Sequence, residues 1–395
     1  MHIKAKEKML TIYLKMYNIK ENIICPVVQI RSRAEKSGKM AKSDVLKSKL
    51  HAQIAAGELK PGDRLDTETV LVERYGLSRY TVRRALEDLE GEGLITRVQG
   101  SGSFVADRPS RPAADTRVVG VICTYISDYI FPSIVNGIES VLTQNGYTLS
   151  LSATKNQADI EEMILQSCLE KPVSGLIVEG SKTALPNPNI GLYNRLVEMG
   201  IPIVFIHAKY SALPNVVTVS VKDKDGGEQA VQYLYNKGHR KIAGLFKGTD
   251  WQGFNRYAGY LEGLRKNGLH FSDERVMWFQ DNSQFSFLLE KGGIDSYLSN
   301  ATAVVCYNDQ IATQLIAALS ARQISVPDDL SVISFDDSNY ASMSVPLLTS
   351  FAHPKERLGE IAAEKMLRMI NGIEEHSVSL DWTLTERCSV KVLHG

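Results

Sequence analysis

The chain has 395 residues, 44% hydrophobic and 23% charged, with equal numbers of basic and acidic side chains. This length and composition are typical of a globular protein with two or three domains. No apolar run reaches the roughly 18 residues of a membrane helix, and no apolar core with a cleavage site follows the N-terminal lysines. A membrane span and a secretory signal are thus excluded, and we expect a cytoplasmic protein.

Residues 1–41 show no clean hydrophobic period and contain nine Lys or Arg but only three Asp or Glu. We interpret this segment as a disordered extension or a misassigned start, because Met40 precedes what looks like the natural beginning of the first domain. That domain, residues 42–106, contains ten basic and ten acidic side chains. Its first helix is predicted from helically spaced apolar residues, and Pro61-Gly62-Asp63 forms the following turn. Those apolar residues are Val45, Leu46, Leu50, Ile54 and Leu59.

Residues 65–105 predict two helices with a sharp turn between them, followed by a β-hairpin. Thr67 is placed to cap a helix running to about Tyr75, which Gly76 ends. Ser78 is placed to cap the second helix. The hairpin pairs residues 94–96 with residues 103–105 around a glycine-rich tip. The order is that of a winged helix-turn-helix, which presents its second helix to the major groove of DNA. The inner face is assigned to Val70, Leu71, Val82, Ala85 and Leu89.

Residues 107–117 are rich in Pro, Ala and charge and are predicted to be an interdomain linker. From residue 118 to 395, short apolar runs alternate with helical stretches. Continuous apolarity within each run indicates parallel strands buried on both faces, with helices between them. The predicted strands are residues 118–123, 147–152, 175–180, 202–207, 216–221, 241–246, 276–280, 301–308 and 330–336.

A weak internal sequence repeat indicates that this second region consists of two similar halves. Each half opens with a strand, a polar loop and a helix that ends at Asn-Gly, and the spacing from Gly137 to Gly146 equals that from Gly259 to Gly268. We therefore expect two α/β lobes whose strand-end loops face one cleft. The five cysteines show no metal-site clustering, and Cys123 and Cys306 are expected to be buried, reduced thiols.

Residues 42–106 resemble the DNA-binding domain of the GntR family of bacterial regulators. The likeness lies in Pro61-Gly62-Asp63-Arg64-Leu65, in Gly76-Leu77-Ser78-Arg79-Tyr80-Thr81-Val82-Arg83, and in the glycine-rich hairpin. Asp66 is a departure, because the family commonly has Pro there. The resemblance implies that Glu68, Arg79, Arg83 and Gln99 read bases, and an arginine fork is well suited to guanine. The full predicted DNA-binding set is Thr67, Glu68, Ser78, Arg79, Tyr80, Thr81, Arg83, Gln99 and Gly100.

Residues 118–395 resemble instead the sugar-binding core of LacI/GalR-type repressors, itself similar to periplasmic sugar-binding proteins. The likeness lies in residues 238–242, Arg256, residues 326–338 and residues 346–350. This fusion of two families resembles the arabinose repressors of Gram-positive bacteria, also through residues 124–140, 188–191, 306–312 and 353–355. The resemblance implies a repressor that binds operator DNA as a homodimer and is released by a sugar, with L-arabinose the first expectation.

A sugar pocket needs a stacking aromatic ring and charged groups that bind pairs of hydroxyls. By family position, Arg256 and Asp336 would grip the sugar. Asp250 and Asp309 have the alternative role of capping helices, Asp337 of holding a loop, and His207 of a satisfied buried histidine. The predicted effector-binding residues are Tyr125, Asp128, Tyr129, Phe131, Glu179, His207, Tyr210, Lys247, Asp250, Gln252, Arg256, Asn308 and Asp336.

Nothing in the sequence predicts a catalytic set, a metal site or a cofactor, so we do not expect an enzyme. GxGxxG and Walker signatures are missing. One alternative remains open: the same repressor responding to another mono- or disaccharide. A winged-domain enzyme fusion carrying pyridoxal phosphate would need a cofactor lysine and a much longer α/β domain, and neither is apparent. A soluble sugar-binding protein would have no use for the N-terminal DNA-binding domain. The expected mechanism is closure of the two lobes around the sugar, which makes the DNA-binding arrangement less populated.

Overall fold

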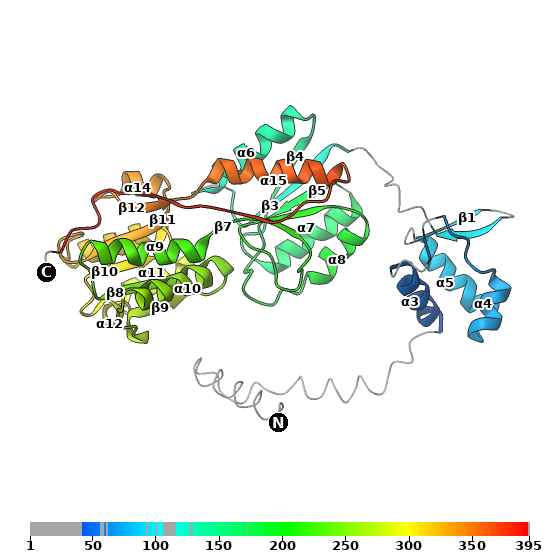
Figure 1. Ribbon diagram of the computed structural model, residues 1–395, viewed down its shortest axis with the longest axis horizontal. Helices are drawn as coiled ribbons and strands as arrows, with labels where there is room; N and C mark the ends of the chain where they lie inside the picture. The colour runs from blue at the N-terminus through cyan, green and yellow to red at the C-terminus, as the bar shows by residue number, and fades with distance from the viewer. Residues whose placement is uncertain are drawn as a thin grey trace, which may run out of the picture. The chain divides into compact units, whose positions relative to one another are not determined.

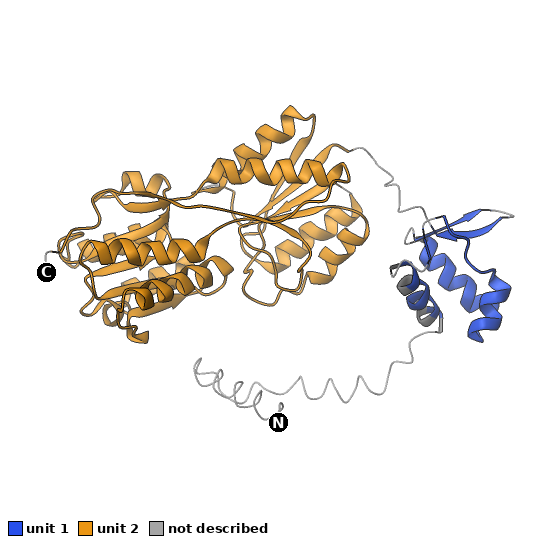
Figure 2. Cartoon of the chain, viewed as in Figure 1, with its two compact units in different colours: residues 1–110 blue, residues 111–395 orange. Residues whose placement is uncertain are grey.

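The structure, a computed structural model, describes residues 42–55, 59–60, 62–91, 94–98, 101–105, 116–126, 129–171 and 173–393. The chain divides into two compact units, residues 1–110 and 111–395 (Figure 2). The predicted extension over residues 1–41 and residues 107–115 of the predicted linker lie outside the described residues. Among the described residues, no helix is both long and apolar enough to cross a lipid bilayer.

The first unit is a three-helix domain followed by a hairpin. Its helices are α3 (Lys42–Ala55), α4 (Glu68–Tyr75) and α5 (Arg79–Gly91), and β1 (Ile95–Val98) pairs antiparallel with β2 (Gly102–Val105). Thr67 Oγ1 accepts a hydrogen bond from the Val70 amide at 3.4 Å, and Gly76 ends α4 with φ of 62°. Ser78 Oγ accepts from the Thr81 amide at 3.1 Å. These contacts confirm the two predicted caps and the turn between them.

The core of the first unit contains four of the five residues assigned to its inner face. Leu71, Val82, Ala85 and Leu89 are buried. Val70 is not: its side chain is 38% exposed, so its assignment to the inner face was wrong. The physical reason is that Leu71 faces the core at this point of α4, and Val70, about 100° away around the helix axis, lies on the side open to solvent.

The second unit consists of two lobes, each built on a six-stranded sheet in the part of the chain that the structure describes. The first lobe has the strand order β13-β7-β6-β5-β3-β4. Helices α6 (Phe131–Gln144) and α15 (Lys355–Ile370) pack side by side on one face, and α7 (Ala158–Glu170) and α8 (Ile190–Glu198) cover the other (Figure 1). Its strands are β3 (Val118–Cys123), β4 (Thr148–Ala153), β5 (Gly175–Val178), β6 (Ile203–Ile206), β7 (Val217–Val221) and β13 (Val378–Leu380).

The second lobe repeats this plan with the strand order β14-β12-β11-β10-β8-β9. Helices α9 (Asp223–Asn236) and α10 (Trp251–Lys266) pack together on one face. The other face carries α11 (Asn282–Glu290), α12 (Asp295–Leu298), α13 (Asp309–Ser320) and α14 (Asn339–Met343). Its strands are β8 (Ile242–Lys247), β9 (Val276–Phe279), β10 (Ala303–Cys306), β11 (Ser331–Asp336), β12 (Thr349–Ala352) and β14 (Thr383–Thr385), and a 3-10 turn, η2 (Asp273–Arg275), precedes β9.

All nine predicted strands are present, and their pairing is parallel, which confirms the predicted fold class. Strands β5, β6, β10 and β11 are buried at every position, as their continuous apolarity predicted. Cys123 and Cys306 are buried and free, as expected. Three strands were not predicted: β12, β13 and β14, of which β14 pairs antiparallel with β12. They are short or lack a continuous apolar run.

The chain passes between the lobes three times. It leaves the first sheet after β7 to form α9 against the second, returns after β12 to form α15 against the first, and passes from β13 to β14 near the C-terminus (Figure 1). The residues at these passages lie at Asp223, His353 and Trp382. Any relative motion of the two lobes must bend the chain at these three connecting segments. We therefore call these segments the hinge.

The internal sequence repeat has a structural basis in paired glycines at two helix contacts. A Cβ on Gly137 would lie 2.2 Å from the Glu356 carbonyl oxygen, so α6 and α15 can approach only because a side chain is absent there. In the other lobe, a Cβ on Gly259 would lie 1.9 Å from the Lys224 oxygen, between α10 and α9. Gly146 and Gly268 then end the corresponding helices with φ of 73° and 62°. Both lobes thus use glycine for the same close contact and the same stop.

Candidate functional site

The exposed face of α5 carries the arginines that are predicted to read DNA. Arg79 and Arg83 are exposed, and Tyr80 is 75% exposed. Arg83 Nη2 donates to Glu68 Oε2 at 3.1 Å, so the first residue of α4 holds an arginine of α5. Arg97 of the hairpin lies 4.0 Å from the same carboxylate. Glu68 therefore orients cations from two elements toward the helix surface.

The other predicted DNA contacts divide into two groups, the hydroxyl side chains at the helix starts and the residues of the hairpin tip. Thr67 and Ser78 use their hydroxyl oxygens as helix caps, and the Thr81 hydroxyl lies 2.8 Å from that of Ser78. The Thr67 hydroxyl proton and one of the Ser78 and Thr81 hydroxyl protons can still be donated to phosphate. Gln99 and Gly100, at the hairpin tip, lie outside the described residues.

Within the second unit, a cavity of about 750 Å³ lies where the two sheets present the carboxyl ends of their strands. Most of the predicted sugar-binding residues meet here from both lobes, because parallel strands of each sheet end at the same edge. The predicted residues that line it are Tyr125, Tyr129, Phe131, Glu179, His207, Lys247, Asp250, Gln252, Arg256, Asn308 and Asp336.

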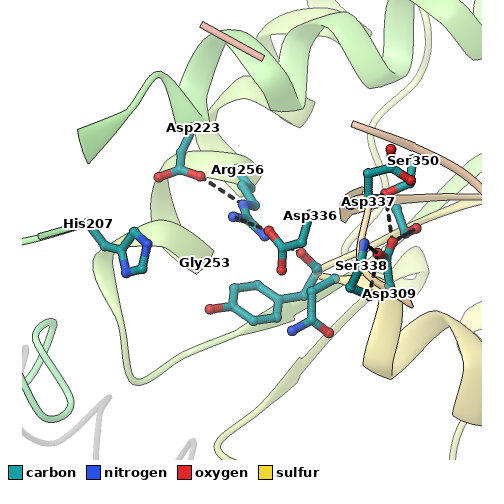
Figure 3. A network of polar contacts seen from close by, with 12 residues as sticks. His207, Asp223, Gly253, Arg256, Asp309, Asp336, Asp337, Ser338 and Ser350 are labelled. Carbon is teal, nitrogen blue, oxygen red and sulfur yellow. Dashed lines mark hydrogen bonds and ion pairs between the residues drawn. The ribbon is translucent and has the colours of Figure 1, made fainter. Parts of the chain in front are cut away.

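Arg256 is buried, belongs to the cavity lining and lies between Asp223 and Asp336 (Figure 3). Its Nε donates to Asp223 Oδ1 at 2.8 Å, its Nη2 lies 3.5 Å from Asp336 Oδ1, and its Nη1 donates to the Tyr307 carbonyl oxygen. Three aromatic rings surround the guanidinium, whose Cζ lies 4.6 to 5.1 Å from their centroids, an arrangement that stabilises a buried cation. The rings belong to Tyr307, Phe335 and Trp382.

Asp336 is held at the end of β11 in an unusual backbone conformation, with φ of 97°. Its Oδ2 accepts a hydrogen bond from the Tyr129 hydroxyl of the other lobe. The neighbouring Asp309 fixes this turn, since it accepts from the Ser338 amide at 2.7 Å and from the Ser350 hydroxyl at 2.6 Å (Figure 3). Burial, followed by the charge of Asp336, raises the pKa of Asp309 to about 6. The Asp336 carboxylate is thus held in a turn that the buried Asp309 carboxylate stabilises.

Glu179 and His207 form a second polar pair on the first-lobe wall. Glu179 Oε2 accepts from the Thr124 amide and hydroxyl at 2.8 and 2.5 Å. Glu179 Oε1 lies 3.1 Å from His207 Nδ1, which fixes that nitrogen as the donor when the ring is neutral. His207 Nε2 is buried and has no hydrogen-bond partner among the described residues. It is therefore a buried acceptor that no described residue uses.

Two predicted residues combine a cavity position with a capping role. Asp250 Oδ1 accepts from the Gly253 amide at 3.2 Å and caps α10, while its Oδ2 lies 2.9 Å from Lys247 Nζ. Burial by itself lowers the pKa of Lys247, but the charge and hydrogen bond of Asp250, together with the charge of Glu179, outweigh it, so that pKa is raised. Asn308 Oδ1 accepts from the Ile311 amide at 3.0 Å, which leaves its amide nitrogen for the cavity.

Tyr210 is absent from the cavity lining, and its assignment there does not match its position in the fold. Its ring is packed against Tyr193 and Phe205 in the first-lobe core, and its hydroxyl lies 2.9 Å from Glu161 Oε2. Tyr210 was assigned to the cavity because it follows the end of β6, but the loop directs its ring into the core of the first lobe. Asp128 lies outside the described residues.

Sequence reasoning missed several residues that complete the site. Tyr307 donates its hydroxyl hydrogen to Asp250 Oδ2 at 3.0 Å, and its place at a strand end, next to Asn308, was a signal that could have found it. Asp223 and Trp382 lie at the hinge, and the sequence around them gives no signal that they belong to the site. In the part of the chain that the structure describes, no group of three His, Cys, Asp or Glu side chains is arranged to hold a metal ion.

Replacing His353 by Phe is expected to change how stability depends on pH. Burial, followed by His207 and Arg256, holds the pKa of the hinge residue His353 well below its ordinary 6.5. In the unfolded chain this ring takes up a proton as pH falls below 6.5, which favours unfolding by about 1.4 kcal/mol per pH unit.

The measurement is urea unfolding of wild type and His353→Phe at pH 7 and pH 5. The wild type should lose about 1–2 kcal/mol more of its free energy of unfolding on acidification than the variant does. Equal losses would show that His353 takes up its proton in the folded state as well. His239, whose pKa burial also lowers, is present in both proteins and cancels in the comparison.

Comparison with known proteins places both units. Residues 42–105 match the model of the gntR family of bacterial regulatory proteins, and residues 231–390 match that of a periplasmic binding protein-like domain. The chain is 37% identical to an arabinose metabolism transcriptional repressor of Geobacillus stearothermophilus, over 84% of this chain and 91% of the relative. A repressor of the same description from Halalkalibacterium halodurans is 34% identical over 83% and 89%. The second unit also resembles the transcription regulator CcpA of Lactococcus lactis, with a TM-score of 0.63, 24% identity and coverage of 69% and 99%.

Proposed function

This chain belongs to the family of arabinose metabolism transcriptional repressors, and we propose that it releases its operator DNA when L-arabinose binds in the cavity between its two lobes. The observation that carries this proposal is the buried pair of Arg256 and Asp336 at the cavity wall. A fixed carboxylate beside a fixed guanidinium offers acceptors and donors to the hydroxyls of a sugar. Tyr129, Glu179, His207 and Lys247 add donors and acceptors around it.

Aromatic rings at the cavity complete the chemistry of a sugar site. Tyr125, Tyr129 and Phe131 line it from the loop after β3 and the start of α6. The C–H faces of a sugar ring pack on aromatic rings, while its hydroxyls require hydrogen bonds in the plane. Polar groups from both lobes surround the cavity, so a bound sugar stabilises the closed arrangement of the lobes.

The repressor acts as a homodimer whose contacts come from the second unit. Exposed apolar side chains in the second lobe support this assignment: Phe287 of α11 is 56% exposed, Met343 of α14 78% and Val345 89%. Both helices pack against α13, so these side chains lie on neighbouring elements. A twofold dimer presents two winged domains to a pseudo-palindromic operator. Sedimentation equilibrium of the full chain measures this state directly.

We infer that the operator is released because L-arabinose shifts the population of the protein from open to closed lobes. L-arabinose binds the closed lobes better than the open ones, and the dimer with closed lobes holds its DNA-binding units in an arrangement that fits the operator less well. A ligand shifts such an equilibrium only by its differential affinity for the two states. Couplings of this type are about 1–3 kcal/mol, which corresponds to roughly a 5- to 150-fold loss of DNA affinity.

L-arabinose is expected to release the repressor from DNA at concentrations that saturate the cavity. The test uses a DNA fragment selected by the full-length protein from a randomised library, in a band-shift titration with L-arabinose, D-xylose, D-ribose, D-galactose and cellobiose. Isothermal calorimetry with the same sugars gives the affinities. No binding and no release with saturating L-arabinose would contradict the proposal, and release by another sugar of the panel would reassign the effector while keeping the repressor.

A further inference from the structure

The N-terminus of α10 is capped by both lobes. The first amide groups of a helix have no partner within it and need outside acceptors. Asp250 Oδ1, from the same lobe, accepts from the Gly253 amide at 3.2 Å. The Trp251 amide instead donates to Thr183 Oγ1 at 3.2 Å, and Thr183 lies in the loop after β5 of the other lobe. Thr183 is therefore a helix cap supplied across the cleft.

A second hydrogen bond between the lobes lies next to the first. The Ala184 amide donates to the Thr249 carbonyl oxygen at 3.2 Å. Thr183 and Thr249 are 5% and 6% exposed, so the contact excludes water. Both threonines also line the sugar cavity. Opening the cleft breaks both bonds and leaves two backbone amides to be solvated.

The loop that carries this contact, Gly180–Leu185, is anchored to its own lobe by a buried carboxylate. Glu161 of α7 is fully buried and accepts from the Ser181 amide at 2.9 Å and from Asn187 Nδ2 at 2.8 Å. The Tyr210 hydroxyl lies 2.9 Å from both Glu161 Oε2 and the Ser181 carbonyl oxygen. The Lys182 amide donates to Asn156 Oδ1 at 2.9 Å. The loop is thus fixed to its own lobe on one side and presents Thr183 on the other.

We propose that Thr183 is a positioning residue for sugar binding, which caps α10 of the opposite lobe as the lobes close and thereby fixes the cavity side chains that α10 carries. Helix α10 and its cap supply Asp250, Gln252 and Arg256 to the cavity. Holding the first turn of α10 therefore holds three cavity side chains at once. The Glu161–Tyr210 contact holds the loop in the position in which Thr183 reaches the Trp251 amide. The sugar-affinity part of this inference rests on the proposed function, whereas the cap itself does not.

The test compares Thr183→Val with Thr183→Ser in the full-length protein. Valine keeps the shape of threonine but lacks the acceptor, and serine keeps the hydroxyl. The first readout is hydrogen–deuterium exchange at the Trp251 amide, at single-residue resolution, without sugar and with saturating L-arabinose. The second is L-arabinose affinity by calorimetry. One hydrogen bond of this kind corresponds to roughly a three- to tenfold change.

The Val variant should exchange the Trp251 amide at least about threefold faster than the wild type and bind L-arabinose roughly three- to tenfold more weakly, with both values restored by Ser. The Gln284 amide, capped by Asp281 within one lobe, should exchange at the same rate in all three proteins. Equal exchange at Trp251 in wild type and Val variant, with and without sugar, overturns the inference.

Failure of the proposed function gives a different pattern. In that case the wild type does not bind L-arabinose, yet the Val variant still exchanges Trp251 faster in the sugar-free protein. A general destabilisation of the Val variant would not give this pattern, because it would also speed exchange at the Gln284 amide, which Asp281 caps within one lobe.

Discussion

An Asp336→Asn variant is expected to bind operator DNA like the wild type and to bind L-arabinose roughly 10- to 150-fold more weakly. The change keeps the size of the side chain, and Asn tolerates the positive φ of 97° at this position better than most residues do. It replaces a carboxylate that accepts on both oxygens with an amide that accepts on one. Hydrogen bonds to a charged group contribute about 1.5–3 kcal/mol, which sets the size of the loss.

The neighbouring residue provides a matched control. Asp337 also has a positive φ, of 42°, but does not line the cavity, and its carboxylate pairs with Arg387 at 2.7 Å and accepts from the Thr385 hydroxyl at 3.0 Å. Asp337→Asn should leave L-arabinose affinity within about threefold of the wild type. Calorimetry and operator release measure both variants. A normal sugar response from Asp336→Asn would mean that the carboxylate does not contact the sugar.

Arg256→Ala is a poorer test of the sugar contact than Asp336→Asn. Arg256 is 1% exposed and pairs with both Asp223 and Asp336. Its removal leaves two buried carboxylates without a cation, a change that typically destabilises a protein by about 3–5 kcal/mol. Lost sugar response in that variant would not separate a missing contact from a partly unfolded second unit.

Arg83→Ala is expected to weaken specific operator binding by about 1–3 kcal/mol, roughly 5- to 150-fold, and to relax base preference at one position in each half-site. The Arg83 side chain is 60% exposed and its guanidinium is oriented by Glu68 at 3.1 Å. An arginine held in this way can present its fork to a guanine edge. Band shifts with the selected operator and with single-base variants measure the effect.

Arg83→Lys distinguishes a base contact from a phosphate contact. Lysine keeps the charge but lacks the planar fork, so the base-contact assignment predicts a loss close to that of alanine. A lysine variant that binds like the wild type would make Arg83 a phosphate contact. The same conclusion follows if Arg83→Ala weakens specific and random DNA equally.

The features that could be predicted from the sequence are those in which cause and effect are a few residues apart. Thr67, Gly76 and Ser78 lie next to the helices they begin or end, and their chemistry is local. The parallel strands could be recognised because burial on both faces leaves a continuous apolar run. The strand-end rule placed most of the cavity residues, since it depends only on where each run stops.

The features that could not be predicted depend on contacts between distant segments. Tyr210 follows a strand as His207 does, yet its hydroxyl is taken by Glu161, 49 residues earlier. Trp382 stacks against Arg256 from the last passage between the lobes. Thr183 caps a helix that begins 68 residues later. None of these partners leaves a mark in the neighbouring sequence, so only the assembled lobes reveal them.

The interleaved path of the chain also bears on how the protein is made. Strand β13 completes the sheet of the first lobe, and β14, only two residues later, completes that of the second. A nascent chain that has emerged from the ribosome as far as α14 therefore exposes an unpaired edge in both sheets. Neither lobe therefore has its complete sheet until the segment from β12 to β14 has been synthesised.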